Sequence, residues 1–128
     1  MLGYTLSMNN SILIVDDCHS MRSAVKTALR RLEVTVVEAE DASSALSCID
    51  EQAFDLIISD VHMPGMDGIE FAEQVRGRTD YKSTPICMLT IDSDAETMLR
   101  GKTAGATAWL VKPFRPEALR EVVKKLVA

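Results

Sequence analysis

Carboxylates and one ammonium group follow three short apolar runs in this chain of 128 residues. Asp16 and Asp17 come directly after the first run. Asp60 follows the second run, and Lys112 follows the third. Runs of this kind predict buried strands, and the carboxyl ends of the strands form the ligand-binding edge of an open α/β sheet. We therefore expect these four side chains to meet in one crevice.

Three carboxylates in one crevice repel one another, so the cluster needs a cation. A hard divalent ion with oxygen ligands, above all Mg²⁺, suits them. Asp16 and Asp17 diverge at the strand end, so one can bind the ion directly and the other through water. Asp60 stands alone before a loop and is the better nucleophile, since a carboxylate can form an acyl phosphate. Lys112 would neutralise charge on the incoming phosphoryl group, and Thr90 would donate a hydrogen bond to it.

Short β-branched runs alternate five times with amphipathic helical patterns. The strands are predicted at residues 11–15, 34–39, 56–59, 86–90 and 108–111. The helices are predicted at residues 20–32, after the N-cap Asp41, at about 69–76, at 95–104 and from Pro116 onwards. This alternation predicts an α/β fold, with a parallel sheet, helices on both faces and right-handed crossovers.

Length and composition restrict the class of protein. The size predicts one domain, and 47% hydrophobic residues are enough for a core. A net charge of −5 argues against nucleic acid or an anionic membrane as the main partner. No apolar run approaches the roughly 18 residues of a membrane span. Residues 1–10 lack the features of a secretion signal, so we expect a loose tail there and one domain over 11–128.

The three cysteines, Cys18, Cys48 and Cys87, are odd in number and irregularly spaced. They form neither a CxxC pair nor a disulfide framework. We therefore expect reduced thiols and a cytoplasmic location.

Four segments together resemble the receiver domains of two-component response regulators. They are ILIVDD (12–17), DLIISDVHMPGMDG (55–68), PICMLT (85–90) and LVKPF (110–114). The likeness spans residues 11–127, and because no output domain follows, the expected type is the single-domain, chemotaxis-like regulator. The resemblance implies a doubly wound, flavodoxin-like fold with five parallel strands in the order 2-1-3-4-5 and five helices.

The resemblance also implies roles for the residues at the matching positions. Asp60 matches the phosphoacceptor, and Lys112 matches the family's lysine. Asp16 and Asp17 match the acidic pair that organises Mg²⁺, with the backbone carbonyl of His62 as a further ligand. The bond between Lys112 and Pro113 is expected to be cis.

A switch is implied as well. Thr90 matches the residue that moves towards the phosphoryl group. Trp109 stands where receivers usually carry Tyr or Phe, a ring that moves with it, and an indole needs a partner for its N–H group. The weak apolar stripe of helix 95–104 predicts a poorly anchored element, from which moving parts are drawn. Strands four and five with helices four and five would then recognise a downstream effector.

The expected function is a phosphoacceptor switch that receives its phosphoryl group from a histidine kinase or a phosphotransfer protein. It is not expected to be an enzyme, because it turns over no external substrate. One alternative is a phosphatase of the haloacid-dehalogenase type, but such enzymes carry Asp-x-Asp after their first strand, whereas here Asp60 and His62 follow the third. Another is a phosphorylation-independent interaction module, although such degenerate receivers usually lose acidic or lysine residues that this chain keeps. No P-loop motif occurs.

Overall fold

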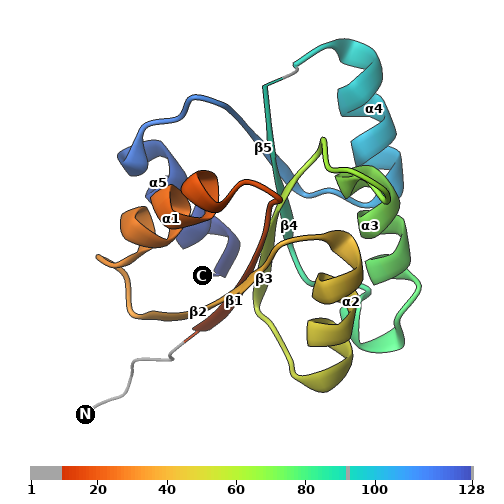
Figure 1. Ribbon diagram of the computed structural model, residues 1–128, viewed down its shortest axis with the longest axis horizontal. Helices are drawn as coiled ribbons and strands as arrows, with labels where there is room; N and C mark the ends of the chain where they lie inside the picture. The colour runs from red at the N-terminus through yellow and green to blue at the C-terminus, as the bar shows by residue number, and fades with distance from the viewer. Residues whose placement is uncertain (1–9, 92, 128) are drawn as a thin grey trace.

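The computed structural model describes residues 10–91 and 93–127 (Figure 1). The strands are β1 (Asn10–Val15), β2 (Val34–Ala39), β3 (Leu56–Asp60), β4 (Ile86–Thr90) and β5 (Ala108–Val111). The helices are α1 (His19–Leu29), α2 (Ala42–Glu51), α3 (Gly68–Arg76), the short 3₁₀ helix η2 (Thr79–Tyr81), α4 (Ala95–Ala104) and α5 (Pro116–Val127). Within these ranges, no helix combines the length and the apolar character that crossing a membrane requires.

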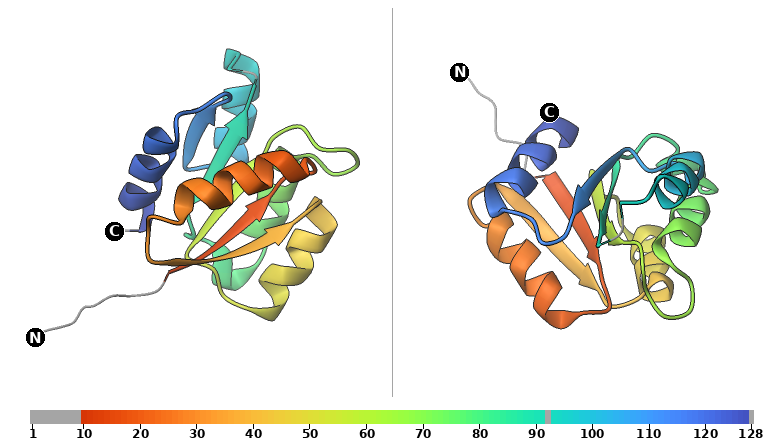
Figure 2. Two further views of the ribbon diagram at one scale, coloured as in Figure 1. Left: turned by 60° about the vertical axis from the view of Figure 1, so that its left-hand side comes forward. Right: turned by 90° about the horizontal axis from the view of Figure 1, so that it is seen from above.

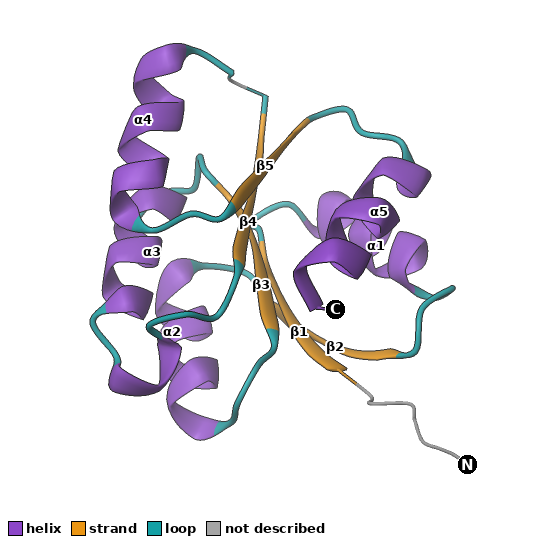
Figure 3. Ribbon diagram, turned by 180° about the vertical axis from the view of Figure 1, so that it is seen from behind, coloured by secondary structure: helices purple, strands orange, loops and turns teal. Residues whose placement is uncertain are grey.

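The five strands form one parallel sheet in the order β2-β1-β3-β4-β5. Helices α1 and α5 cover one face of the sheet, and α2, α3 and α4 cover the other (Figures 2 and 3). This arrangement confirms the predicted fold class and strand order. In such a sheet the strand order reverses beside β1, which is where ligand crevices form.

Both faces of the sheet are buried, which explains the continuous apolar runs of the central strands. Every residue of β3 and β4 is buried. Successive residues of β1 alternate between the two sides, because Leu13 and Val15 pack against α2 and α3, whereas Ile12 and Ile14 pack against α1 and α5. The two hydrophobic clusters thus share one central sheet, which fixes the positions of its strand ends.

Several predicted boundaries differ from the structure, and α1 and α3 each begin one residue earlier than expected, at His19 and Gly68. α1 ends at Leu29 instead of Leu32, because the chain turns at this point and the Leu32 amide donates to the Leu29 carbonyl instead. β3 includes Asp60, which pairs in register with Leu89 of β4. Asn10 belongs to β1, while the other residues of the expected tail lie outside the described part of the chain.

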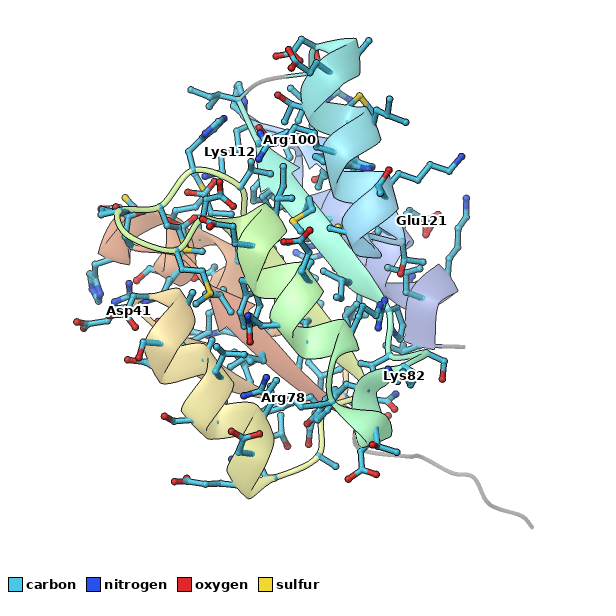
Figure 4. The ribbon with its side chains drawn as sticks, turned by 90° about the vertical axis from the view of Figure 1, so that its right-hand side faces the viewer. Asp41, Arg78, Lys82, Arg100, Lys112 and Glu121 are labelled. Carbon is cyan, nitrogen blue, oxygen red and sulfur yellow. The ribbon has the colours of Figure 1, made fainter. Side chains whose placement is uncertain are left out.

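The edge of the sheet at which the strands begin, called here the amino edge, is held together by hydrogen bonds between connecting segments. The Arg76 guanidinium donates to the carbonyls of Gly105 and Tyr81, in each case at 2.7 Å. The Tyr81 hydroxyl donates to the Gln52 carbonyl at 2.7 Å. These bonds tie the segments that follow α2, α3 and α4 to one another. Figure 4 shows Arg78, beside this edge, far from Lys112.

The start of α3 is defined by a capping box immediately after the loop that follows Asp60. The Asp67 carboxylate accepts a hydrogen bond from the Glu70 amide at 2.8 Å, and the Glu70 carboxylate accepts one from the Asp67 amide at 3.1 Å. Two backbone donors that a helix end leaves unpaired are satisfied in this way.

We predict that Asp67→Ala lowers the free energy of unfolding by about 1 kcal/mol, because it removes this cap. Urea denaturation measures the change. Glu73→Ala on the exposed side of the same helix is the control and should change stability by less than about 0.5 kcal/mol. Equal effects of the two substitutions would show that the capping box does not stabilise α3.

Candidate functional site

The register of the sheet brings the predicted site residues to one edge. Val15 of β1 pairs with Ser59 of β3, so Asp16 and Asp60 are the next residues on neighbouring strands. Lys112 follows β5 directly, and Figure 4 shows it at the end of the molecule opposite Arg78 and Lys82. The crevice expected from the sequence therefore forms where the strands end.

Three carboxylates converge in this crevice. Asp16, Asp17 and Asp60 each present one oxygen within 4.8 Å of the other two. They differ in exposure: Asp16 is 1% exposed and Asp60 is 7% exposed, whereas Asp17 is open to solvent. The cluster therefore has a buried side formed by two strand ends and an accessible side formed by Asp17.

The Lys112 ammonium group joins the two buried carboxylates. Its Nζ atom lies 3.3 Å from Asp16 Oδ2 and 3.2 Å from Asp60 Oδ1. The lysine side chain is itself only 12% exposed. Ion pairs in such surroundings are weakly screened by solvent, so the attraction between these groups is stronger than at an open surface. The peptide bond between Lys112 and Pro113 is cis, as expected.

Backbone groups orient the two buried carboxylates. The Cys18 amide donates to Asp16 Oδ1 at 2.9 Å, and the His62 amide donates to Asp60 Oδ1 at 3.4 Å. The turn after β3 folds tightly onto the strand, since the Gly68 amide donates to the Val61 carbonyl at 2.8 Å. A Cβ atom at Gly68 would overlap the Asp60 carbonyl oxygen, so only glycine allows α3 to begin this close to the site.

Arg22 of α1 is a supporting residue that the sequence analysis missed. Its Nη1 atom donates to the Asp16 carbonyl oxygen at 2.7 Å, and its Nε atom lies 3.1 Å from Glu38 Oε1 on β2. A single arginine on an amphipathic helix usually indicates a solvated face. Its role follows from a contact with β2 that has no signature in the local sequence.

The remaining predicted site residues surround the crevice. Thr90 is 1% exposed at the end of β4, one residue beyond Leu89, which pairs with Asp60. The Lys112 amide donates to the Thr90 carbonyl at 2.8 Å. The His62 side chain is exposed beside Asp60. Trp109 lies two residues before the end of β5 and is half-buried. It packs against the hydrophobic core on the side of the sheet covered by α2, α3 and α4.

Burial raises the pKa of the Asp60 carboxyl above its ordinary value, and the negative charge of Asp16 raises it further. The Lys112 ammonium group and the His62 amide act in the opposite direction without cancelling the increase. The ionised cluster is therefore incompletely neutralised by the protein's own groups, and an added cation would relieve the remaining repulsion.

The donor set fits Mg²⁺. That ion binds oxygen ligands at about 2.0–2.1 Å in octahedral geometry, so ligand oxygens lie about 3 to 4 Å apart. The three carboxylates need only small movements to reach such spacings. Neither a thiolate nor an imidazole belongs to the cluster, which favours a hard ion. No second group of three metal-binding side chains occurs in residues 10–91 and 93–127.

An open cavity of about 430 Å³ adjoins the accessible side of the cluster. It is lined by Asp17, His19, Arg22, Glu40, Asp41 and Pro64. The cavity gives solvent and solutes a route to the carboxylates from the side of Asp17.

Comparisons with known proteins agree with this geometry. A family model described as the response regulator receiver domain matches residues 12–124. Chemotaxis protein CheY-3 of Vibrio cholerae serotype O1 is 36% identical over 122 residues, which cover 94% of both chains. Chemotaxis protein CheY of Pseudomonas aeruginosa is 36% identical over 90% of this chain and 94% of that protein. The structure of chemotaxis protein CheY4 of Vibrio cholerae matches with a TM-score of 0.89 and 43% identity, covering 93% of this chain and 99% of that one.

The raised pKa of Asp60 predicts the effect of removing its charge. Folding disfavours the ionised carboxylate, and this cost is fully present above the folded-state pKa and disappears as the pH falls below the unfolded-state value. In metal-free buffer at pH 7, Asp60→Asn should therefore raise the free energy of unfolding by on the order of 1 kcal/mol. Lys112 keeps Asp16 as its partner in this variant.

Denaturation from pH 7 to pH 3.5 measures the effect, and the gain should shrink as the wild-type carboxyl takes up its proton. Asp50→Asn is the matched control, because Arg78 lowers the pKa of Asp50 and its loss should give no gain. A pH-independent gain for Asp60→Asn would contradict the electrostatic origin of the effect.

Proposed function

This chain belongs to the response regulator receiver domains and is homologous to chemotaxis response regulators of two-component systems, and from that premise we propose that Asp60 is its phosphoacceptor and that Mg²⁺ supports the transfer. The observation that carries the proposal is the convergence of Asp16, Asp17 and Asp60 on the Lys112 ammonium group at the edge of the sheet. A phosphoaspartate switch needs this combination of nucleophile, acidic ion site and cationic side chain.

In the proposed reaction, a carboxylate oxygen of Asp60 forms a bond to phosphorus while the bond from phosphorus to the imidazole nitrogen of a phosphohistidine breaks. The imidazole keeps the electron pair and takes a proton from solvent. Lys112 moves from pairing with the Asp60 carboxylate to pairing with the phosphoryl oxygens, for which it is already positioned 3.2 Å from Asp60 Oδ1. Bound Mg²⁺ supplies positive charge that offsets the charge of the transferred group.

Asp16, Asp17 and Asp60 would hold the ion, together with the backbone carbonyl of His62. Asp16 is fixed by the Cys18 amide and by its backbone contact with Arg22, so it offers a preorganised ligand. Asp17 is exposed and needs no rearrangement of the core to bind. The roles of the two aspartates thus follow from their different surroundings.

Phosphorylation is proposed to move Thr90 and Trp109. It replaces the single charge of Asp60 with about two charges and adds strong hydrogen-bond acceptors. Thr90 stands at the end of the neighbouring strand and can supply a donor. The resulting change would bias β4, α4, β5 and α5, whose outer surface we propose as the binding site for a downstream effector. Ligand-controlled states of this kind are population shifts.

The phosphoryl donor is proposed to be a histidine kinase or a phosphotransfer protein. Chemotaxis is the proposed pathway, because it is named in the relatives that match over nearly the whole chain. A cytoplasmic location fits the three free cysteines. We also propose that the chain promotes only its own phosphorylation and dephosphorylation, so it should not release phosphate continuously from small phosphomonoesters.

We predict that acetyl phosphate with Mg²⁺ raises the intact mass of the wild-type chain by one phosphoryl group. Asp60→Asn should lose this gain, because the amide is not a nucleophile. Asp80→Asn, an exposed aspartate at the amino edge, is the control and should be modified like the wild type. Intact-protein mass spectrometry measures all three chains, and an Asp60→Asn chain that is modified at the wild-type rate would disprove the assignment.

We also predict that Mg²⁺ raises the melting temperature, and that the stabilisation grows with the logarithm of the ion concentration once this exceeds the Kd. At an ion concentration 100 times the Kd, the stabilisation is about 2.7 kcal/mol. Asp17→Asn should weaken the dependence on Mg²⁺ while changing the metal-free stability little, because Asp17 is exposed. Thermal denaturation across a Mg²⁺ titration measures both quantities. The same Mg²⁺ dependence in Asp17→Asn and in Asp80→Asn would show that Asp17 does not bind the ion.

A further inference from the structure

α4 is attached to the rest of the molecule mainly at its C-terminal end. Its only buried residues are Gly101 and Ala104, both within its last four positions. In the first six positions of the helix only Thr97 and Met98 are half-buried and the others are exposed, including Leu99 at 66%. Figures 1 and 3 show the first turn of α4 projecting beyond the other helices. Little packing therefore opposes movement of this end of the helix.

The attachment at the C-terminal end is an unusually close contact between α4 and β5. A Cβ atom at Gly101 would overlap Cζ2 and Cη2 of the Trp109 indole. The ring therefore lies directly against the helix backbone, in a notch that exists because position 101 has no side chain. Glycine is the least favourable residue in a helix interior apart from proline. Its presence inside α4 is explained by the size of the ring that it accommodates.

A second contact fixes the same end of the helix. Gly105, the C-cap of α4, has a φ of 112° and accepts hydrogen bonds from Arg76 Nε at 3.3 Å and Arg76 Nη2 at 2.7 Å. The end of α4 is thus held by Arg76 of α3 and by Trp109 of β5.

Trp109 connects this end to the phosphorylation site. It pairs in register with Met88, two residues before Thr90, and it lies three residues before Lys112. A displacement of the ends of β4 and β5 therefore acts on the strand segment that carries the indole. The ring is half-buried, so it has a solvent-facing side towards which it can move.

We propose that Gly101 is a positioning residue that seats the Trp109 ring, and that this seat makes α4 pivot about its C-terminal end when the ring moves. The signalling part of this inference rests on the proposed function, whereas the seat itself does not. Movement of the strand ends at the site displaces the ring. Because the ring fills the notch in α4, the helix must adjust when the ring moves, and this adjustment displaces its exposed first turns.

The seat is tested first by the sign of a stability change. Helix propensity alone predicts that Gly101→Ala raises the melting temperature. We expect it to lower the melting temperature by a few degrees in the wild-type chain, because the new methyl group displaces the ring. In a Trp109→Phe background the same substitution should raise it, since phenylalanine lacks the part of the indole that occupies the notch. An increase in both backgrounds would overturn the inference.

Fluorescence tests the position of the ring, because Trp109 is the only tryptophan. Gly101→Ala should shift its emission to longer wavelength by exposing the indole to water. Gly77→Ala is the matched control: Gly77 is the C-cap of α3 with a φ of −70°, and the nearest atom that its added Cβ would meet lies at 3.3 Å. That variant should emit like the wild type. Unchanged emission in Gly101→Ala would also overturn the seat.

Beryllofluoride with Mg²⁺, which imitates the phosphoryl group, tests the coupling. The wild-type emission should change when beryllofluoride is added, and this change should be at least twofold smaller in Gly101→Ala. Both samples are first shown by mass spectrometry to accept one phosphoryl group from acetyl phosphate. A full response in Gly101→Ala, or no response in a wild type that is phosphorylated, would overturn the coupling. If no chain is phosphorylated, the proposed function fails together with the coupling, while the melting-temperature reversal still decides the seat.

Discussion

The site depends on one electrostatic balance, in which a single ammonium group is shared by two buried carboxylates that repel each other. Asp16 and Asp60 come from adjacent parallel strands, and the register that aligns Val15 with Ser59 forces them together. Lys112 reaches both carboxylates from β5, across the end of the intervening strand β4. One positive charge cannot satisfy two negative ones, so burial leaves Asp60 with a raised pKa. The rest of the sheet supplies the packing energy that keeps this unfavourable group in place.

Much of the fold was predictable because the apolar periodicity agrees along the chain with the positions of the turn and capping residues. β2, β4, β5 and α4 have the bounds that the sequence indicated. The end of α1 was wrong, because Leu32 continues the helical spacing although the backbone has already turned. The inclusion of Asp60 in β3 was also missed. Hydropathy places the end of a strand before a charged residue, even when the backbone of that residue still pairs with the neighbouring strand.

The convergence of Asp16, Asp17, Asp60 and Lys112 was predictable because parallel strands deliver their ends to a common edge. Arg22 and Gly101 could not be found in the same way. Arg22 of α1 bridges the Asp16 carbonyl and Glu38 of β2, and Gly101 of α4 acts through a ring on β5. Contacts between elements leave no periodic signal in either segment, so such residues emerge only when the elements are seen packed together.

The hydrogen bonds at the amino edge have a consequence for how such a protein can diversify. Arg76 and Tyr81 tie together the connecting segments on the side of the sheet opposite the carboxylates. Loops at the other end are therefore largely relieved of holding the fold together, and natural selection can alter their length and composition at little cost in stability. Gene duplicates could in this way acquire different phosphoryl lifetimes and different cognate proteins while inheriting an unchanged scaffold.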